Sequence, residues 1–200
     1  MQKKSVEEVL QGAEFILLTA QHGLEDMRTT PGRLRSGFAN VVNWGRSVTF
    51  ALPHLKNIVQ DFEAWYEPEM AKLKADPIAG YMYVLRNKIV KEGESISLTN
   101  EVVIHDFQPE RDFGPRPPGS VAMFVGDSEG GSGWMIKTPS GELEKYYISL
   151  RPEVASIYCS LRNPPVINGV PVDSPVELAR LYLSSLERLV REARQRFHSL

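Results

Sequence analysis

The sequence predicts an α+β protein, in which an up-and-down helical bundle is followed by a β-rich hairpin insertion and a C-terminal helix. Residues 1–94 hold four segments with apolar side chains at helical spacing. Residues 95–172 change to alternating and β-branched stretches between prolines and glycines, and residues 173–200 return to the helical period. Short links between the first four segments favour a bundle, and the wide apolar stripe of the last helix indicates that it packs back on that bundle.

The first two helices have recognisable starts. Ser5 and Glu8 form a capping box, after which apolar side chains hold one helical face over about five turns. Thr30 as N-cap and Pro31 at the first helical position predict the start of the second helix. Pro53 is expected to bend or end that helix, because its ring removes a backbone donor and clashes with the preceding turn.

The third and fourth helices are predicted at 58–73 and from Pro77 onward. Pro68 falls inside the third segment and argues against one continuous helix there. Asp76 and Pro77 form a typical opening for the fourth helix. Gly93 is a suitable stop for it, because glycine adopts the left-handed conformation that often ends a helix.

The β-rich insertion is predicted to contain five strands. The stretch TPSG, 138–141, suits a hairpin turn, because proline presets one turn dihedral angle and glycine tolerates positive φ. The stretches FGPRPPGS, 113–120, and RNPPVINGVPVD, 162–173, indicate stiff connectors. GDSEGGSGW, 126–134, lacks the lysine and following helix of a phosphate-binding loop, which favours a flexible hairpin loop. The predicted strands are 96–98, 102–107, 121–125, 134–137 and 143–150.

The C-terminal helix has the clearest pattern in the chain. Ser174 is its predicted cap, Pro175 takes the first helical position and Glu177 completes a capping box. Five arginines occupy the faces away from the apolar stripe, and acidic residues four positions before two of them predict a solvated, self-neutralising surface. The predicted ion pairs are Glu187 with Arg191 and Glu192 with Arg196.

Composition restricts the classes of function. The chain has 42% hydrophobic residues, 24% charged residues and a net charge of −2, which is typical of a globular protein and gives no overall attraction for nucleic acid. No run of 18 apolar residues occurs, so no membrane association is expected. The single cysteine, Cys159, is expected to be a semi-buried structural thiol in a reducing cytoplasm. No histidines or cysteines have metal-ligand spacing, and we expect neither a metal nor another cofactor.

The stretch LRNKIVKEG, 85–93, holds the candidate ligand-binding residues Arg86, Asn87 and Lys91. At about 100° per residue, Arg86 and Lys91 lie roughly 140° apart on an α-helix, whereas Asn87 and Lys91 share a face. The two cations can meet one ligand only if the helix end unwinds near Gly93, or if a second subunit contributes its copy across a two-fold axis. The sequence therefore predicts a homodimer with a composite site.

This arrangement resembles the HEPN superfamily (higher eukaryotes and prokaryotes nucleotide-binding), in which an apolar helix carries Arg, often Asn, and a His four to six residues after the Arg. The resemblance covers residues 1–93 and the last helix, and it implies a dimerising bundle that acts as a metal-independent endoribonuclease in active members. Here Lys91 stands where the histidine is expected. The stretches GDSEGGSGW and EKYYISL also resemble bacterial proteins of similar layout, but that likeness implies no function.

The lysine weighs against catalysis. Cleaving RNA without metal requires proton transfer near neutral pH, which histidine, with an ordinary pKa near 6.5, performs well and lysine, near 10.4, does not. Arginine and lysine still bind phosphate. We therefore expect a degenerate module that binds RNA, a nucleotide or a protein partner in bacterial defence or regulation. The alternatives are a working endoribonuclease and a structural interaction protein without a ligand site.

Overall fold

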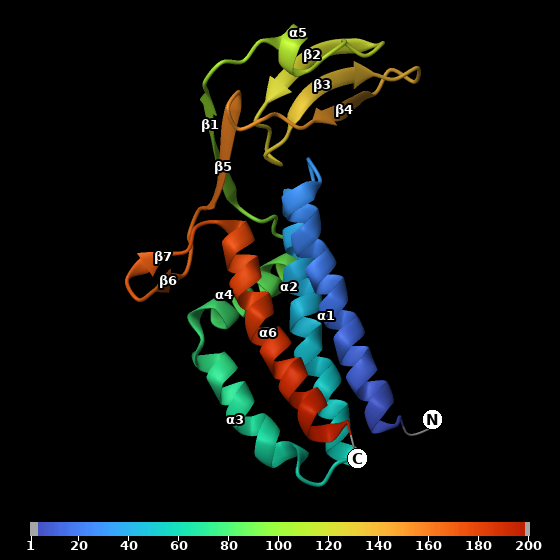
Figure 1. Ribbon diagram of the computed structural model, residues 1–200, viewed down its shortest axis with the longest axis vertical. Coiled ribbons are helices and arrows are strands. Elements are labelled where there is room, and N and C mark those ends of the chain that lie inside the picture. Colours follow the sequence, from blue (N-terminus) through green and yellow to red (C-terminus); the bar gives the residue numbers. More distant parts are fainter. Residues whose placement is uncertain (1–3, 199–200) are drawn as a thin grey trace.

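The computed structural model describes residues 4–198, arranged as two parts along one long axis (Figure 1). One part is a bundle of helices, and the other is a small antiparallel β-structure, the head, which lies beyond one end of the bundle. A two-stranded ribbon joins them, and the β-rich region precedes the last helix, so the α+β class and its order are confirmed. Residues 1–3 of the predicted bundle and residues 199–200 of the predicted C-terminal helix lie outside the described residues.

Helices α1, α2, α4 and α6 form the bundle, and α3 packs against one side of it (Figure 1). Their buried faces share a core in which Phe38, Val42, Met82, Leu183 and Leu186 are almost fully enclosed. Burying such side chains stabilises the fold by about 1.5–3 kcal/mol each. The helices are α1 Val6–Thr29, α2 Leu34–Ala51, α3 Phe62–Ala75, α4 Pro77–Asn87 and α6 Pro175–Phe197.

The start of α1 is confirmed, and the start of α2 was predicted wrongly. The capping box of Ser5 and Glu8 is present in both directions. Thr30, by contrast, ends α1, and α2 begins only at Leu34 with no cap from its own N-cap residue. Its cap comes from the head instead, because Glu129 Oε2 accepts a hydrogen bond from the backbone N–H of Arg35 at 3.2 Å. A carboxylate at a helix N-terminus is favourable both as an acceptor and by charge.

Prolines act differently in the next two helices. Pro53 ends α2 as predicted, and the chain continues as the short 3₁₀-helix η1, Leu52–Asn57. The third helix is Phe62–Ala75 rather than 58–73, and Pro68 lies inside it without a break. Pro68 and Ala64 are both exposed, so the carbonyl oxygen that loses its helical donor is open to water.

The head and ribbon differ from the predicted strands. The expected strands 96–98 and 102–107 are replaced by the single strand β1, Leu98–Ile104, whose partner β5, Ala155–Leu161, was not predicted. The TPSG turn joins β3 to β4 as expected, with Gly141 at φ 91°. The connector 162–173 contains a small hairpin, β6 Val166–Ile167 and β7 Val170–Pro171. The head contains β2 Ser120–Val125, β3 Ser132–Lys137, β4 Leu143–Ile148 and the short helix α5 Pro109–Asp112.

The β2–β3 loop, 126–131, fastens the head to the bundle instead of moving freely. Arg35 Nε lies 3.3 Å from Glu129 Oε1 and donates to the carbonyl oxygen of Ser128 at 2.9 Å. Asp127 holds the loop itself, since Oδ1 accepts from the N–H groups of Glu129 and Gly131, at 3.0 and 2.9 Å. The loop is therefore an ordered joint between the two parts.

Candidate functional site

Helix α4 carries two of the three predicted site residues on its outer side. Asp76 caps the helix by accepting from the N–H of Ile78 at 2.9 Å, and Pro77 takes the first position as predicted. Ile78 and Met82 are buried in the core. That orientation leaves Asn87 and Arg86 partly exposed near the end of the helix.

Beyond Asn87 the chain does not stop but winds more widely, as the π-helix η2, Lys88–Glu92. The N–H of Gly93, at φ 67°, bonds to the carbonyl oxygen of Lys88, five residues earlier. In such a turn residues five apart come close to the same face, whereas in an α-helix they diverge. The widened turn therefore reduces the separation of Arg86 and Lys91 within one chain.

Both cations act on Tyr83, one turn earlier on α4. The Asn87 side chain hydrogen-bonds to the Tyr83 hydroxyl, and with the positive charges of Lys91, Arg46 and Arg86 this holds the pKa of Tyr83 below its ordinary value. A hydrogen bond to the phenolate and nearby cations each favour the ionised form. The hydrogen bond from Asn87 is the larger cause of the lowered pKa, and the three cations add to it.

Arg46, from α2, was not predicted as a site residue. Its guanidinium carbon lies 4.7 Å from the ring centre of Phe50 and 5.2 Å from that of Tyr83, and Nη1 donates to Thr49 Oγ1 at 3.0 Å. The Phe50 and Tyr83 rings are themselves about half exposed. We call Arg46, Tyr83, Arg86, Asn87 and Lys91 the cationic cluster.

The cations of this cluster form no ion pairs in the described part of the chain. Among residues 4–198, no carboxylate lies within 4.0 Å of the charged nitrogens of Arg46, Arg86 or Lys91. A surface charge without a partner is free to take up an external anion, because no existing ion pair has to be broken.

Three arginines of α6 have acidic partners, although not the partners predicted. Arg188 pairs with Glu69 at 2.9 Å and with Glu192 at 3.2 Å, so the predicted pair of Glu192 with Arg196 is wrong. Glu187 accepts from Gln21 at 2.6 Å instead of pairing with Arg191. The other pairs are Arg180 with Glu177 and Arg194 with Glu7 and Glu14.

A groove of about 330 Å³ adjoins the cationic cluster. Arg46, Tyr83 and Lys74 line its polar side, and apolar side chains such as Leu73 and Leu186 line the rest. No acidic residue lines it among the described residues. A groove of this kind suits a ligand with a flat or apolar body and a negative group.

The sequence did reveal part of this site. Arg86, Asn87 and Lys91 were found because they lie within one short stretch, 85–93, whereas Arg46 was missed because it reaches the cluster from α2. The spacing of Tyr83 to Asn87, four residues, was a usable signal for two side chains on one face. No group of three or more side chains suited to a metal occurs in the described chain, and none of its helices has the length and apolar character of a membrane span.

Comparison with known protein families gives a match over half of the chain. The model of a family described as bacteriophage lambda protein ea47 matches residues 19–127, a region that contains the whole cationic cluster. No curated protein and no solved structure matches.

Proposed function

The chain belongs to the family of bacteriophage lambda protein ea47, and we propose that it binds RNA through phosphate groups at the cationic cluster. The observation that carries the proposal is the guanidinium of Arg46 lying 4.7 and 5.2 Å from the ring centres of Phe50 and Tyr83, with the charges of Arg86 and Lys91 acting on the same Tyr83 hydroxyl. None of these three cations forms an ion pair in the described chain. Phosphate oxygens are strong acceptors for guanidinium and ammonium groups.

The aromatic rings beside the cluster favour single-stranded RNA over an isolated phosphate. Tyr83 and Phe50 are half exposed and flank the guanidinium of Arg46. Bases of single-stranded RNA stack on such rings and on arginine planes, while the backbone follows the cations. A free nucleotide shares this chemistry, so a binding assay has to include both ligands.

Salt dependence of binding tests the proposal. For single strands, each neutralised phosphate contributes a slope of about −0.7 to the logarithm of affinity against the logarithm of salt concentration, so three cations give roughly −2. A labelled single-stranded RNA of mixed sequence, measured by fluorescence anisotropy, should lose affinity about 20-fold between 50 and 200 mM salt. Replacing Arg46, Arg86 or Lys91 by Ala should each reduce the slope by about 0.7.

The matched control is Lys137→Ala, which removes an exposed cation that has no ion pair in the described chain and lies in the head. It should leave affinity and slope unchanged. Equal losses from Lys137→Ala and Arg86→Ala would mean that binding follows total charge, and the proposed site would then be wrong. Competition by free nucleotide at the same site would favour a nucleotide as the ligand.

A metal-independent endoribonuclease is the second candidate, and the lowered pKa of Tyr83 is the observation in its favour. A phenol beside three cations is a better proton donor to a leaving oxygen than an ordinary tyrosine. Incubation of mixed RNAs with a chelator tests it: cleavage that is lost in Tyr83→Phe and Arg86→Ala would replace the binding-only proposal. Lys91→His introduces the residue of the HEPN resemblance, and cleavage gained by it would support that relationship.

The homodimer remains a prediction. Because Arg46, Arg86 and Lys91 all act on the Tyr83 hydroxyl of the same chain, the proposed RNA site does not require a second subunit. Light scattering at tens of micromolar protein gives the oligomeric state, and RNA titration of the same sample gives its stoichiometry. Binding of one RNA by a monomer would remove the composite site while leaving the cationic cluster in place.

A further inference from the structure

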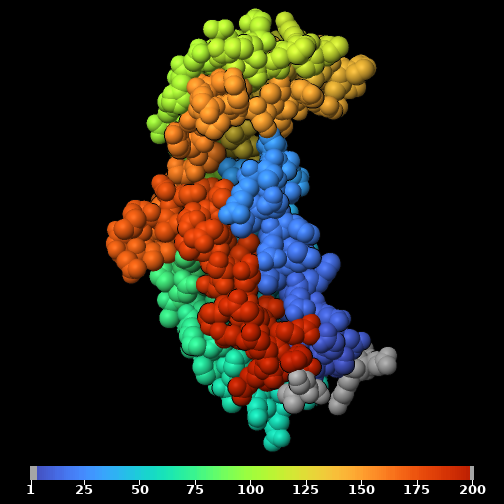
Figure 2. All heavy atoms as spheres, in the orientation of Figure 1, coloured from blue at the N-terminus to red at the C-terminus, as the bar shows by residue number. Residues whose placement is uncertain are grey.

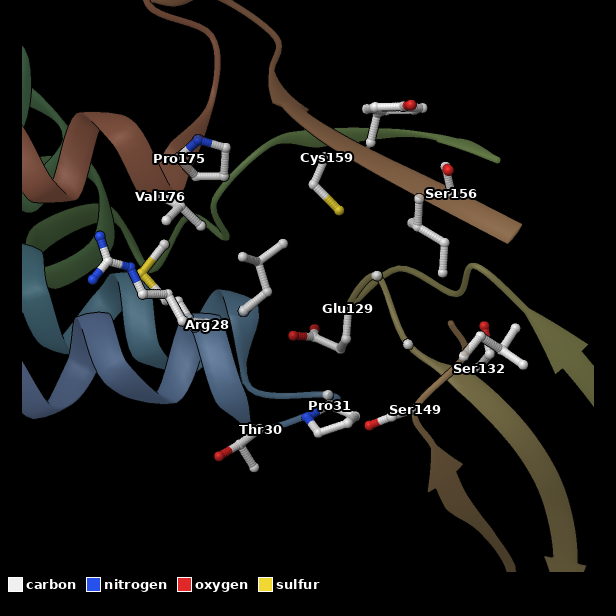
Figure 3. A pocket seen from close by; sticks show the side chains of 18 of the residues that line it. Arg28, Thr30, Pro31, Glu129, Ser132, Ser149, Ser156, Cys159, Pro175 and Val176 are labelled. Carbon is white, nitrogen blue, oxygen red and sulfur yellow. The ribbon is translucent and has the colours of Figure 1, made fainter. Parts of the chain in front are cut away.

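A second cavity lies between the head and the bundle, away from the cationic cluster. Its volume is about 940 Å³, and it is lined by the end of α1, the α1–α2 turn, the β2–β3 loop, the start of α6 and residues 155–160 of β5. In Figure 3 Cys159 and Ser156 of β5 face Thr30 and Pro31 across this space, with Glu129 between them. Figure 2 shows the head projecting beyond the end of α1 and α2. The cavity is a cleft between two parts of the chain that are held together.

Strand β5 has one paired edge and one open edge. The ribbon contains only β1 and β5, and in Figure 1 the two strands run side by side between the bundle and the head. Side chains from both faces of β5, for example Cys159 and Tyr158, line the cavity. Neighbouring side chains of a strand point to opposite faces. A cavity that is lined by side chains from both faces of β5 therefore runs along the edge of this strand.

The hydrogen bonds at the ribbon's ends determine which backbone groups face the open edge. The N–H of Arg162 bonds to Ser97 O, and the N–H of His105 bonds to Val154 O. Because antiparallel pairs alternate between bonded and non-bonded, residues 156, 158 and 160 bond to β1, and residues 155, 157, 159 and 161 face outward. The N–H of Leu161 agrees, since it bonds outward to Asp173 O at 2.7 Å.

The backbone of Ile157 and Cys159 is therefore unpaired at the open edge. The outward N–H groups at the two ends of the strand are used, by Leu161 to Asp173 and by Ala155 to Arg151. Within residues 4–198, no hydrogen bond satisfies the outward N–H and C=O groups of Ile157 and Cys159. Proteins normally protect open edges with charge, proline or a bulge, and the sequence ASIYCSL of β5 has none of these.

We propose that this edge binds an extended peptide segment of a partner protein, which adds to the ribbon as a third strand beside β5. Main-chain hydrogen bonds to Ile157 and Cys159 supply the pairing, as in other cases of strand addition. The cleft leaves room for the added strand, and its walls select the side chains.

Charge on the walls favours a basic segment. Glu101 and Asp173 line the cleft without ion pairs in the described chain, and Glu129 is neutralised by Arg35. Arg28 is the one cation among the described lining residues. The lining thus has an excess of negative charge, which a lysine or arginine of the partner segment complements.

Amide hydrogen exchange, followed by NMR on the full chain, tests the proposal residue by residue. In the free protein the N–H groups of Ile157 and Cys159 should exchange rapidly, and that of Tyr158, which pairs with β1, more slowly. The probe is an acetylated seven-residue peptide of alternating valine and threonine with a central lysine, at up to millimolar concentration. It should slow exchange at Ile157 and Cys159 at least tenfold. Val102, whose N–H faces outward from the far edge of β1, should not change.

Two peptide controls separate backbone pairing from simple attraction. The same peptide methylated at alternate backbone nitrogens should no longer slow exchange at Ile157 and Cys159. The peptide with glutamate in place of lysine should bind more weakly. Ile157→Pro removes one outward N–H without removing a bond to β1, and it should abolish binding. If this variant does not fold, the exchange measurement on the natural chain decides alone.

Three results would overturn the proposal. The first is slow exchange of Ile157 and Cys159 in the free monomer, and the second is no protection of either residue at millimolar peptide. The third is protection that appears without peptide as the protein concentration rises, because a second copy of the chain would then occupy the edge.

Discussion

Substituting one glycine in the contact between α1 and α2 provides a quantitative test of the bundle. Gly37 of α2 lies against Gly23 of α1, and a Cβ atom built on Gly37 would lie 2.5 Å from the carbonyl oxygen of Gly23 and 2.8 Å from Met27 Cγ. The oxygen belongs to the backbone of a long helix, so relief requires α1 to move by nearly 1 Å, given ordinary contacts near 3.5 Å. Gly37→Ala therefore forces the two helices apart.

The expected magnitude is a balance of two terms. Alanine in a helix interior is favoured over glycine by about 1 kcal/mol, and overpacking a close contact typically costs about 1–3 kcal/mol. The closest atom, the carbonyl oxygen of Gly23, belongs to the backbone and cannot turn aside as the end of a side chain can. The upper part of the overpacking cost therefore applies, and Gly37→Ala should lose about 1–2 kcal/mol of stability. The midpoint of thermal unfolding should fall by about 3–6 °C in a chain of this size.

Gly12→Ala is the matched control, since it lies on the same helix pair with nothing within 4 Å of a built Cβ. There only the helix preference acts, and stability should rise by about 0.5–1 kcal/mol. Urea unfolding followed by far-UV circular dichroism gives both values. If Gly37→Ala were as stable as Gly12→Ala, the close approach of α1 and α2 would be refuted.

Three further predictions concern the head and the last helix. Burial tends to raise the pKa of Asp127, but hydrogen bonds from Lys145 and from N–H groups of its own loop outweigh it and lower that pKa. The ionised Asp127 therefore stabilises the fold above its unfolded pKa near 3.9, and this contribution is lost as pH falls through the pKa of the folded state. Asp127→Asn should flatten the acid side of a curve of unfolding free energy against pH. Arg35→Ala should speed hydrogen exchange in loop 126–131 and lower the free energy of unfolding by about 1.5–3 kcal/mol. The control, Arg33→Ala, removes an exposed ion pair and should change the free energy of unfolding in urea by less than about 1 kcal/mol. Ser174→Ala removes the cap of α6 and should cost about 1 kcal/mol in the same assay.

The sequence predicted the helix caps whose hydrogen bonds join residues close together in the chain. The capping residues Ser5, Asp76 and Ser174 form the expected bonds, because a cap depends on residues two or three positions away. The start of α2 failed for the opposite reason, since its capping carboxylate, Glu129, is 94 residues from Arg35. Strand β5 was missed in the same way: its pairing with β1 joins residues more than 50 positions apart.

The candidate site depends both on residues close together in the sequence and on contacts between distant segments. Arg86, Asn87 and Lys91 stand out in the stretch LRNKIVKEG, 85–93, but α-helical spacing places Arg86 and Lys91 on different faces. The π-turn at Lys88–Glu92 changes this relationship, and α-helical spacing does not show such a turn. Arg46 then joins from α2, where the neighbouring Gly45 lets the helix approach the ring of Tyr182 on α6, because a built Cβ there would lie 2.5 Å away. The arrangement of the cationic cluster therefore depends on helix packing as much as on its own residues, so variants that shift α2 should weaken RNA binding even when every cation is retained.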